Sequence, residues 1–307
     1  MKTLPKGFYT ALGTPLDQRG NVLTGSLAAQ VQQQCRAGAA GLLVLGSMGI
    51  QAYLKQDQAA IAVAAVSETL RNESNDAGKG QRPVFLAGVM DNSIERVLQR
   101  IELLRGFDLD GVVATTPFYG LCNDEALLNF FTRIADRSPY PLYLYDLPGV
   151  TKIKITLPLV RKIAEHPNVR GIKTGDMILA RWLRLDESLR ERFCPIFSGL
   201  DIFDVAAAAG FDHFLDGMFA CCPRTTERTF RSFEQKQFED GAKSLNQILD
   251  LRDTMLRFGI FPAFTIVMNQ LGLPGSHAPD YEPEAIPEAH DVLRNKLIEM
   301  GELAGPR

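Results

Sequence analysis

Short apolar segments recur eight times along this chain, and each is followed by a longer segment with the apolar spacing of a helix. The eight segments are FYTALGTP (8–15), GLLVLG (41–46), PVFLAG (83–88), GVVATTP (111–117), PLYLYDLPG (141–149), VRGIK (169–173), PIFSG (195–199) and HFLDG (213–217). Strands that alternate with helices in this way form a parallel sheet with right-handed crossovers. Eight such units predict a closed (β/α)8 TIM barrel.

The chain is longer than a barrel needs. A (β/α)8 barrel takes about 250 residues, whereas this chain has 307. We therefore expect the barrel in residues 1–225 and a C-terminal α-helical region in residues 226–307. Within the barrel, Asp201 is the expected N-cap of the helix after the seventh strand.

The segment RNESNDAGKGQRP (71–83) is polar and rich in glycine, and we expect a surface loop there. Its G-K-G sequence is not followed by serine or threonine. It therefore does not match the phosphate-binding loop pattern.

Composition excludes several function classes. A formal net charge of -3 provides no basic surface for a nucleic acid. No stretch approaches the roughly 18 apolar residues of a membrane span, and the start lacks a signal peptide, so we expect a cytoplasmic protein with neither nucleic acid nor membrane as partner. The four histidines have no metal-ligand spacing, and neither a metal site nor a cofactor is expected. The five cysteines, which include the adjacent pair Cys221 and Cys222, form no C-x-x-C motif and are expected to be reduced thiols.

In a closed parallel barrel, functional residues gather at the C-terminal ends of the strands. Lys173 stands at such an end, directly after the apolar Ile172. Partial burial at the barrel mouth favours the neutral amine, because an ammonium is costly to remove from water. A neutral amine can attack a ketone and form a Schiff base. The alternative is a lysine that packs its stem on apolar neighbours and keeps its head in solvent.

Two further strand ends carry groups that suit this chemistry. In the alternating pattern of a strand, Tyr143 and Tyr145 share one face, and a phenol beside the amine could transfer protons. A purely packing role is the alternative for these tyrosines. The glycine-flanked turn at Ser47 and Met48 offers backbone N–H groups to an anion such as a carboxylate. The alternative there is an ordinary βα turn.

Five motifs at these strand ends, in this order, resemble those of one family. They are GSMG (46–49), TPFY (116–119), YDLPG (145–149), GIKTG (171–175) and SGLD (198–201). The set is similar to the N-acetylneuraminate lyase and dihydrodipicolinate synthase family of class I, Schiff-base aldolases. The resemblance extends from GFYTALGTPLD (7–17) past residue 226, which is nearly the whole chain.

The resemblance implies a role for each matching residue. Lys173 matches the Schiff-base lysine, and Tyr145 matches the tyrosine that shuttles protons and orients the keto acid. Ser47 matches a hydroxyl that holds the pyruvate carboxylate and joins a proton relay, with the N–H of Met48 as a further donor. Tyr119 matches a tyrosine that reaches the active site of a neighbouring subunit. The resemblance also implies a homotetramer built as a dimer of dimers, and it places two further residues along the substrate pocket: Gly199 and Leu215.

The chain also departs from the family pattern. Met48 and Ile50 replace the usual threonine and glutamate of the turn, and Val150 stands where the synthase branch has an arginine that grips its second substrate. Asp146 replaces an asparagine, and residues 174–175 (Thr-Gly) replace Glu-Ala. These changes favour retro-aldol cleavage, or a related dehydration, of a 2-keto or 2-keto-3-deoxy acid.

Two alternatives remain open at this point. One is dihydrodipicolinate synthase itself, which condenses pyruvate with aspartate semialdehyde. The other is a catalytically silent barrel that binds a keto acid as a sensor or accessory subunit.

Overall fold

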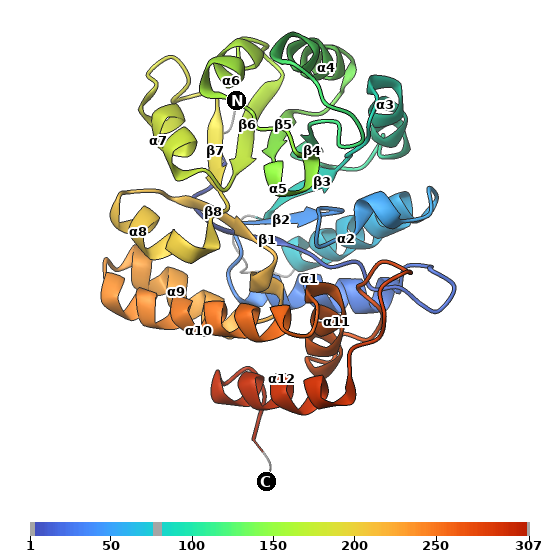
Figure 1. The fold of residues 1–307 in the computed structure, drawn as a ribbon, viewed down its shortest axis with the longest axis vertical. Coiled ribbons are helices and arrows are strands. Elements are labelled where there is room, and N and C mark those ends of the chain that lie inside the picture. The colour runs from blue at the N-terminus through green and yellow to red at the C-terminus, as the bar shows by residue number, and fades with distance from the viewer. Residues whose placement is uncertain (1–3, 76–81, 306–307) are drawn as a thin grey trace.

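The computed structural model describes residues 4–75 and 82–305. Within them, eight parallel strands close into a barrel in chain order, and β8 pairs with β1 (Figure 1). The strands are β1 (Gly7–Ala11), β2 (Gly41–Val44), β3 (Val84–Gly88), β4 (Gly111–Thr115), β5 (Leu142–Asp146), β6 (Val169–Thr174), β7 (Cys194–Phe197) and β8 (His213–Asp216). The predicted (β/α)8 barrel is confirmed.

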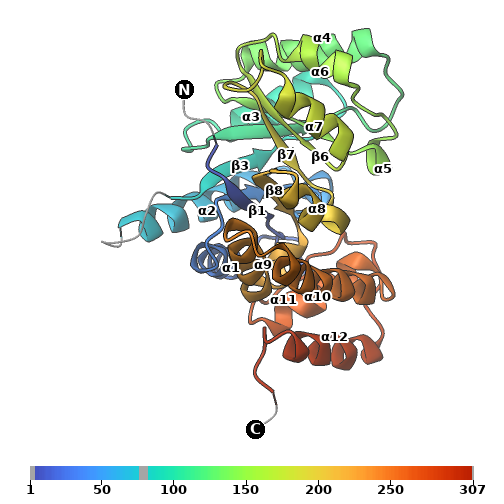
Figure 2. The same ribbon diagram turned by 90° about the vertical axis from the view of Figure 1, so that its left-hand side faces the viewer.

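Helices surround the barrel and continue past it at the C-terminus. Those between the strands are α1 (Thr24–Arg36), α2 (Gln58–Asn75), α3 (Ile94–Leu103), α4 (Asp124–Arg137), α5 (Pro148–Thr151), α6 (Leu157–Ile163), α7 (Met177–Leu185) and α8 (Phe203–Ala208), with short 3-10 turns η1 (Gln51–Tyr53), η2 (Leu200–Ile202) and η3 (Met218–Ala220). After β8 come α9 (Pro223–Glu234), α10 (Phe238–Leu256), α11 (Ile260–Gln270) and α12 (Pro287–Glu299). Figure 2 shows α10 to α12 on one side of the barrel, with α12 farthest from the strands.

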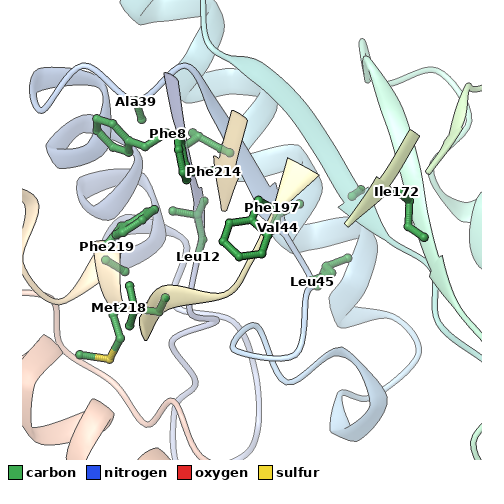
Figure 3. Close-up of a cluster of buried hydrophobic side chains, with 14 of the residues drawn as sticks. Phe8, Leu12, Ala39, Val44, Leu45, Ile172, Phe197, Phe214, Met218 and Phe219 are labelled. Carbon is green, nitrogen blue, oxygen red and sulfur yellow. The ribbon is translucent and has the colours of Figure 1, made fainter. Parts of the chain in front are cut away.

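Two apolar layers stabilise the fold. The outer one joins the strands to their helices and includes Phe8, Phe214 and Phe219 (Figure 3). The inner one fills the barrel with side chains such as Tyr9 and Tyr143. These large rings fit because glycines face them, in the alternation of large and small residues that is common in small barrels. A Cβ on Gly171 would lie only 2.7 Å from the ring of Tyr143, and one on Gly41 only 2.2 Å from the ring of Tyr9.

Alternation along β5 follows the predicted pattern. Tyr143 and Tyr145 lie in the inner cluster, whereas Leu142 and Leu144 lie in the outer one. The prediction that both phenols share one face of this strand is confirmed.

The prediction for Asp201 is wrong. The chain forms η2 before α8, so the N-cap position of α8 falls on Ile202, which makes no side-chain cap. Asp201 lies inside η2 and accepts a hydrogen bond from Nη1 of Arg252 at 2.7 Å.

One predicted boundary differs from the observed elements. Residues 71–75 belong to α2 rather than to a loop, because they contain neither glycine nor proline to end the helix. The G-K-G sequence at 78–80 lies outside the described residues. Helix α9 spans residue 226 and follows β8 after the short turn η3, in the place of the eighth barrel helix. The division of the chain at residue 226 stays a prediction.

No helix within residues 4–75 and 82–305 is both long and apolar enough to cross a membrane.

Candidate active site

Lys173 and Tyr145 form the centre of the candidate site. They are register partners on the adjacent parallel strands β6 and β5. Gly171 and Lys173 alternate with the outward Ile172, so the lysine enters the barrel, where it is only 7% exposed. Its Nζ donates a hydrogen bond to Oη of Tyr145 at 2.8 Å and lies 4.0 Å from the centroid of the ring.

Ser47 is the third member of this group. It lies in the turn that follows β2, and its Oγ donates to Oη of Tyr145 at 3.4 Å. The structure therefore brings together three of the four predicted catalytic side chains, and Tyr145 contacts both of the others. A phenol that touches an amine and a hydroxyl can pass a proton in either direction.

The turn around Ser47 has a strained backbone. Leu45 and Ile50 have φ values of +59° and +47°, which are uncommon for residues with large side chains. The hydroxyl of Thr14 supports the turn by donating to the Gly49 carbonyl at 2.7 Å. Gly88 lets the turn approach β3, since a Cβ there would lie 1.9 Å from the carbonyl oxygen of Leu45.

The turn has backbone donors available for a ligand. Within the described part of the chain, the N–H groups of Ser47, Met48 and Gly49 donate to no protein acceptor. Successive free N–H groups in a turn form a concavity that binds anions. A carboxylate placed there would lie beside Ser47 and hence near Tyr145.

The other three predicted pocket residues lie at or near the ends of β2, β7 and β8. The side chain of Met48 lies against the backbone at the end of β8, where a Cβ on Gly217 would be 2.3 Å from its Cγ. Leu215 is fully buried inside the barrel, so only its backbone could face a substrate. Gly199 follows β7, and a Cβ there would lie 2.5 Å from the ring of Phe197.

Among the described residues, Tyr119 makes no hydrogen bond or ring contact with the other predicted catalytic residues of its own chain. It lies in the loop after β4 and is 93% exposed. The loop is held by Asn92, whose Oδ1 accepts hydrogen bonds from the N–H groups of Phe118 and Tyr119, both at 2.8 Å. Leu121 in the same loop is also exposed.

The structure adds two carboxylates that the sequence interpretation did not include in the site. Burial raises the pKa of Asp216 at the end of β8, although the Met218 N–H, which donates to it at 2.8 Å, and the nearby Lys173 oppose this shift. Asp146, which follows Tyr145, is buried and accepts hydrogen bonds from Lys154 and from Oγ1 of Thr174 at 2.7 Å. Each is a charged residue at the end of an apolar strand, which is the signal that could have identified it.

A cavity of about 340 Å³ adjoins Tyr145 at the C-terminal ends of β5, β6 and β7. Its volume suits a small ligand. Its lining consists of Tyr145, Asp146, Leu147, Pro148, Lys154, Gly175, Asp176 and Ser198. The described residues include no group of three or more His, Cys, Asp or Glu side chains placed to hold a metal ion.

Comparisons with known proteins identify the family of the chain. A sequence profile of the Dihydrodipicolinate synthetase family matches residues 4–283. A 4-hydroxy-tetrahydrodipicolinate synthase from Gluconobacter oxydans is 24% identical over 268 residues, which cover 87% of each protein.

Solved structures with the same fold are more distant in sequence. YagE from E. coli K12, a prophage protein of the dihydrodipicolinic acid synthase family in complex with pyruvate, superposes with a TM-score of 0.86 at 17% identity, over 98% of this chain and 100% of that one. CdNal from Clostridium difficile, in complex with mannosamine, superposes with a TM-score of 0.85 at 17% identity, over 96% and 99% of the two chains. At such identities the likeness establishes the fold.

Proposed function

The chain belongs to the dihydrodipicolinate synthetase family, whose members are class I lyases and aldolases, and we propose that it cleaves a 2-keto acid, such as a 2-keto-3-deoxy acid, through a Schiff base on Lys173. The observation that carries the proposal is the 2.8 Å contact between Nζ of Lys173 and Oη of Tyr145 inside the barrel mouth. An amine buried beside a phenol has both a nucleophile and a proton-transfer group within reach of one carbonyl.

The first half of the reaction forms the Schiff base. The lone pair of Nζ attacks the keto carbon, and the carbonyl oxygen takes a proton from Tyr145. The attacking nitrogen then gives one of its protons to the Tyr145 phenolate, and Tyr145 passes this proton to the hydroxyl of the carbinolamine. The hydroxyl leaves as water, the protonated C–N double bond forms, and Tyr145 is left as a phenolate. Ser47, whose hydroxyl donates to Oη of Tyr145 at 3.4 Å, stabilises this phenolate by a hydrogen bond.

The second half breaks a carbon–carbon bond. The protonated imine accepts the electron pair of the bond between C3 and C4 and becomes an enamine. The proton of the C4 hydroxyl passes to Tyr145, and C4 leaves as an aldehyde. Protonation of the enamine and hydrolysis of the imine then release pyruvate and regenerate Lys173.

The substrate carboxylate is assigned to the turn after β2. The free N–H groups of Ser47 and Met48, together with the Ser47 hydroxyl, provide donors for it. Because these groups adjoin Tyr145, a carboxylate bound there would direct the adjacent keto carbon toward Lys173.

We also propose that the protein works as a homo-oligomer, arranged as a dimer of dimers. Support comes from the loop of Tyr119 and Leu121, which exposes both side chains and is ordered by Asn92. In such an assembly Tyr119 would complete the proton relay of the neighbouring subunit. None of the five cysteines forms a disulfide bond in the described part of the chain, in keeping with the proposed location in the reducing cytoplasm.

Dihydrodipicolinate synthesis is the second candidate, because the named sequence relatives carry that activity in their names. Val150, however, is an exposed apolar side chain and cannot bind the carboxylate of aspartate semialdehyde. A panel of 2-keto-3-deoxy acids assayed for released pyruvate, run beside condensation of pyruvate with aspartate semialdehyde, separates the two activities.

Borohydride trapping tests the proposal itself. After incubation with pyruvate and reduction, mass spectrometry should find the adduct on the peptide that contains Lys173. The Lys173→Arg variant should lose the adduct, whereas Lys243→Arg, which changes an exposed lysine on α10, should keep it. An unmodified peptide under saturating pyruvate, with a control aldolase labelled in parallel, would indicate a silent binding barrel instead.

A further inference from the structure

The cavity beside Tyr145 contains a small network of charges. Lys154 pairs with the carboxylate of Asp146 and, at 3.2 Å, with Oδ2 of Asp176. Asp146 is buried, whereas the side chains of Lys154 and Asp176 are 39% and 34% exposed. Two of the three charged groups can therefore reach a ligand in the cavity.

The network is fixed to the strands that carry the reactive groups. Asp146 and Thr174 are register partners and directly follow the partners Tyr145 and Lys173. Thr174 donates to Asp146 at 2.7 Å, as does the N–H of Ile155 at 3.1 Å. Asp146 is thus fully engaged by the protein, and it orients Lys154.

Asp176 is held equally firmly. It is the N-cap of α7, where its Oδ1 accepts hydrogen bonds from the N–H groups of Ile178 and Leu179 at 2.9 and 3.0 Å. Burial would raise the pKa of Asp176, but the Leu179 N–H and Lys154 outweigh it and lower the pKa below its usual value. Its carboxylate is therefore ionised at neutral pH, and Oδ2 faces Lys154.

The balance of charge in the cavity disfavours a second anionic group on the substrate. Two carboxylates face one ammonium, and the remaining lining residues are uncharged. A carboxylate or phosphate would have to compete with Asp146 and Asp176 for Lys154. The repulsion between its negative charge and these two carboxylates would weaken its binding. A hydroxyl group can instead donate to Asp176 and accept from the free N–H of Lys154.

We propose that Lys154 and Asp176 determine substrate specificity by hydrogen-bonding the hydroxyl groups of a neutral, polyhydroxylated aldehyde fragment. This inference rests on the proposed function, because the fragment is the part of the substrate beyond the carbon–carbon bond that breaks. The cavity begins at Tyr145, the residue that takes the proton of the C4 hydroxyl, so the chain beyond C4 would enter it. The carboxylate end lies instead at the Ser47 turn.

The test uses the reverse, condensing direction with saturating pyruvate and three aldehydes. These are D-glyceraldehyde, propanal, which has the same carbon chain without hydroxyls, and succinic semialdehyde, which is anionic. We expect kcat/KM for glyceraldehyde to exceed that for propanal by about 10- to 100-fold, because hydrogen bonds to charged groups are the strong ones. Succinic semialdehyde should be the poorest of the three.

Two variants connect the preference to the residues. Lys154→Met keeps the apolar stem and removes the ammonium, and Asp176→Asn keeps an acceptor for the N-cap and removes the charge. Each variant should reduce the ratio of kcat/KM for glyceraldehyde to kcat/KM for propanal by about tenfold. The ratio is measured within one preparation, so partial unfolding does not change it. Lys243→Met on α10 is the matched control and should keep the wild-type ratio.

The outcomes separate the two proposals. Suppose that pyruvate is trapped on wild-type Lys173. If the wild type then shows no preference for glyceraldehyde, or if both variants keep the wild-type preference, the role of Lys154 and Asp176 is overturned and the Schiff-base proposal stands. A higher kcat/KM for succinic semialdehyde than for glyceraldehyde would also overturn the role of Lys154 and Asp176 and leave the Schiff-base proposal standing. Absence of the pyruvate adduct in the wild-type protein overturns both proposals.

Discussion

The amine of Lys173 and the phenol of Tyr145 are neighbours because their residues are register partners on two adjacent parallel strands. Their 2.8 Å separation therefore depends on the sheet and not on a flexible loop. Sites supported by regular elements hold their geometry more closely than sites on loops. A change that removes one functional atom and preserves the strand should accordingly report on chemistry alone.

Tyr145→Phe is such a change. It keeps the ring beneath Lys173 and removes the hydroxyl that contacts both Nζ and Ser47. We expect kcat for pyruvate release to fall by about 10²- to 10⁴-fold, the usual contribution of a proton-transfer group. Tyr143→Phe is the control, because Tyr143 lies on the same face of β5 but deeper in the barrel. Wild-type turnover in Tyr145→Phe would exclude the phenol from proton transfer.

Met48→Thr tests the carboxylate position. The change adds a hydroxyl donor to the turn and removes the contact of Met48 with Gly217. One added hydrogen bond to a carboxylate should lower KM for pyruvate by about tenfold. Met48→Leu keeps an apolar side chain without a hydroxyl and should leave KM near the wild-type value. An unchanged KM in Met48→Thr would place the carboxylate elsewhere.

If the exposed loop after β4 forms a subunit contact, kcat should depend on oligomerisation. Leu121→Asp should weaken the assembly, since a charge in an apolar contact is costly to desolvate, and kcat should fall with the oligomeric fraction in analytical ultracentrifugation. Leu256→Asp changes another exposed leucine, at the end of α10, and serves as the control. Full activity in a monomeric Leu121→Asp protein would show that Tyr119 is not shared between subunits.

The sequence was sufficient for much of the barrel because parallel strands alternate with helices in a fixed order. The same order placed Lys173, Tyr145 and Ser47 at one end of the barrel, where they do meet. The prediction that failed concerns a local feature, the N-cap of α8. Asp201 was expected to be this cap, but the chain forms a 3-10 turn before α8 and Asp201 pairs with Arg252 instead. A turn of this kind depends on tertiary contacts that no local pattern contains.

The charge network of the cavity could not be predicted from the sequence either. Asp146, Lys154 and Asp176 are separated along the chain, and nothing in their spacing indicates that one ammonium lies between two carboxylates. Asp216 lies within the predicted strand segment 213–217, but its burial near Lys173 depends on closure of the barrel between β8 and β1. Long-range pairing of this kind is visible only in three dimensions.

His213, at the start of β8, predicts a loss of stability at alkaline pH. Burial alone would lower its pKa, but the 2.8 Å hydrogen bond to Asp212, together with Cys194 and the backbone of Leu4, outweighs burial and raises the pKa of His213 to about 10. The folded protein then holds a proton that the unfolded chain releases near pH 6.5, so this stabilisation is complete below that pH and declines as the pH rises toward 10. Urea unfolding from pH 6.5 to 10 should show this decline, and His213→Gln should reduce it. An equal decline in both proteins would assign it to other groups.

His277 should instead make the folded protein less stable at acidic pH. It is fully buried against Phe264, with ring centroids 5.4 Å apart, and neither ring nitrogen has a hydrogen-bond partner of good geometry in the described structure. Burial lowers the pKa of His277 to about 4, and the backbone of Leu273 opposes this only in part. Because the unfolded chain binds a proton near pH 6.5 and the folded chain does not, stability should fall as the pH decreases from 6.5 toward 4.

The size of this effect follows from linkage. The difference between the two pKa values corresponds to a loss on the order of 3 kcal/mol in the free energy of unfolding. His277→Met removes the titrating ring and fills the space with an adaptable apolar side chain. The variant should therefore be at least as stable as the wild type at pH 5, because an unpartnered buried polar group is itself destabilising. Carboxylates titrate in the same range, so the measurement is the difference between the two unfolding curves at each pH. A difference that stays constant from pH 7 to 4 would show that His277 is not the group that protonates on acid unfolding.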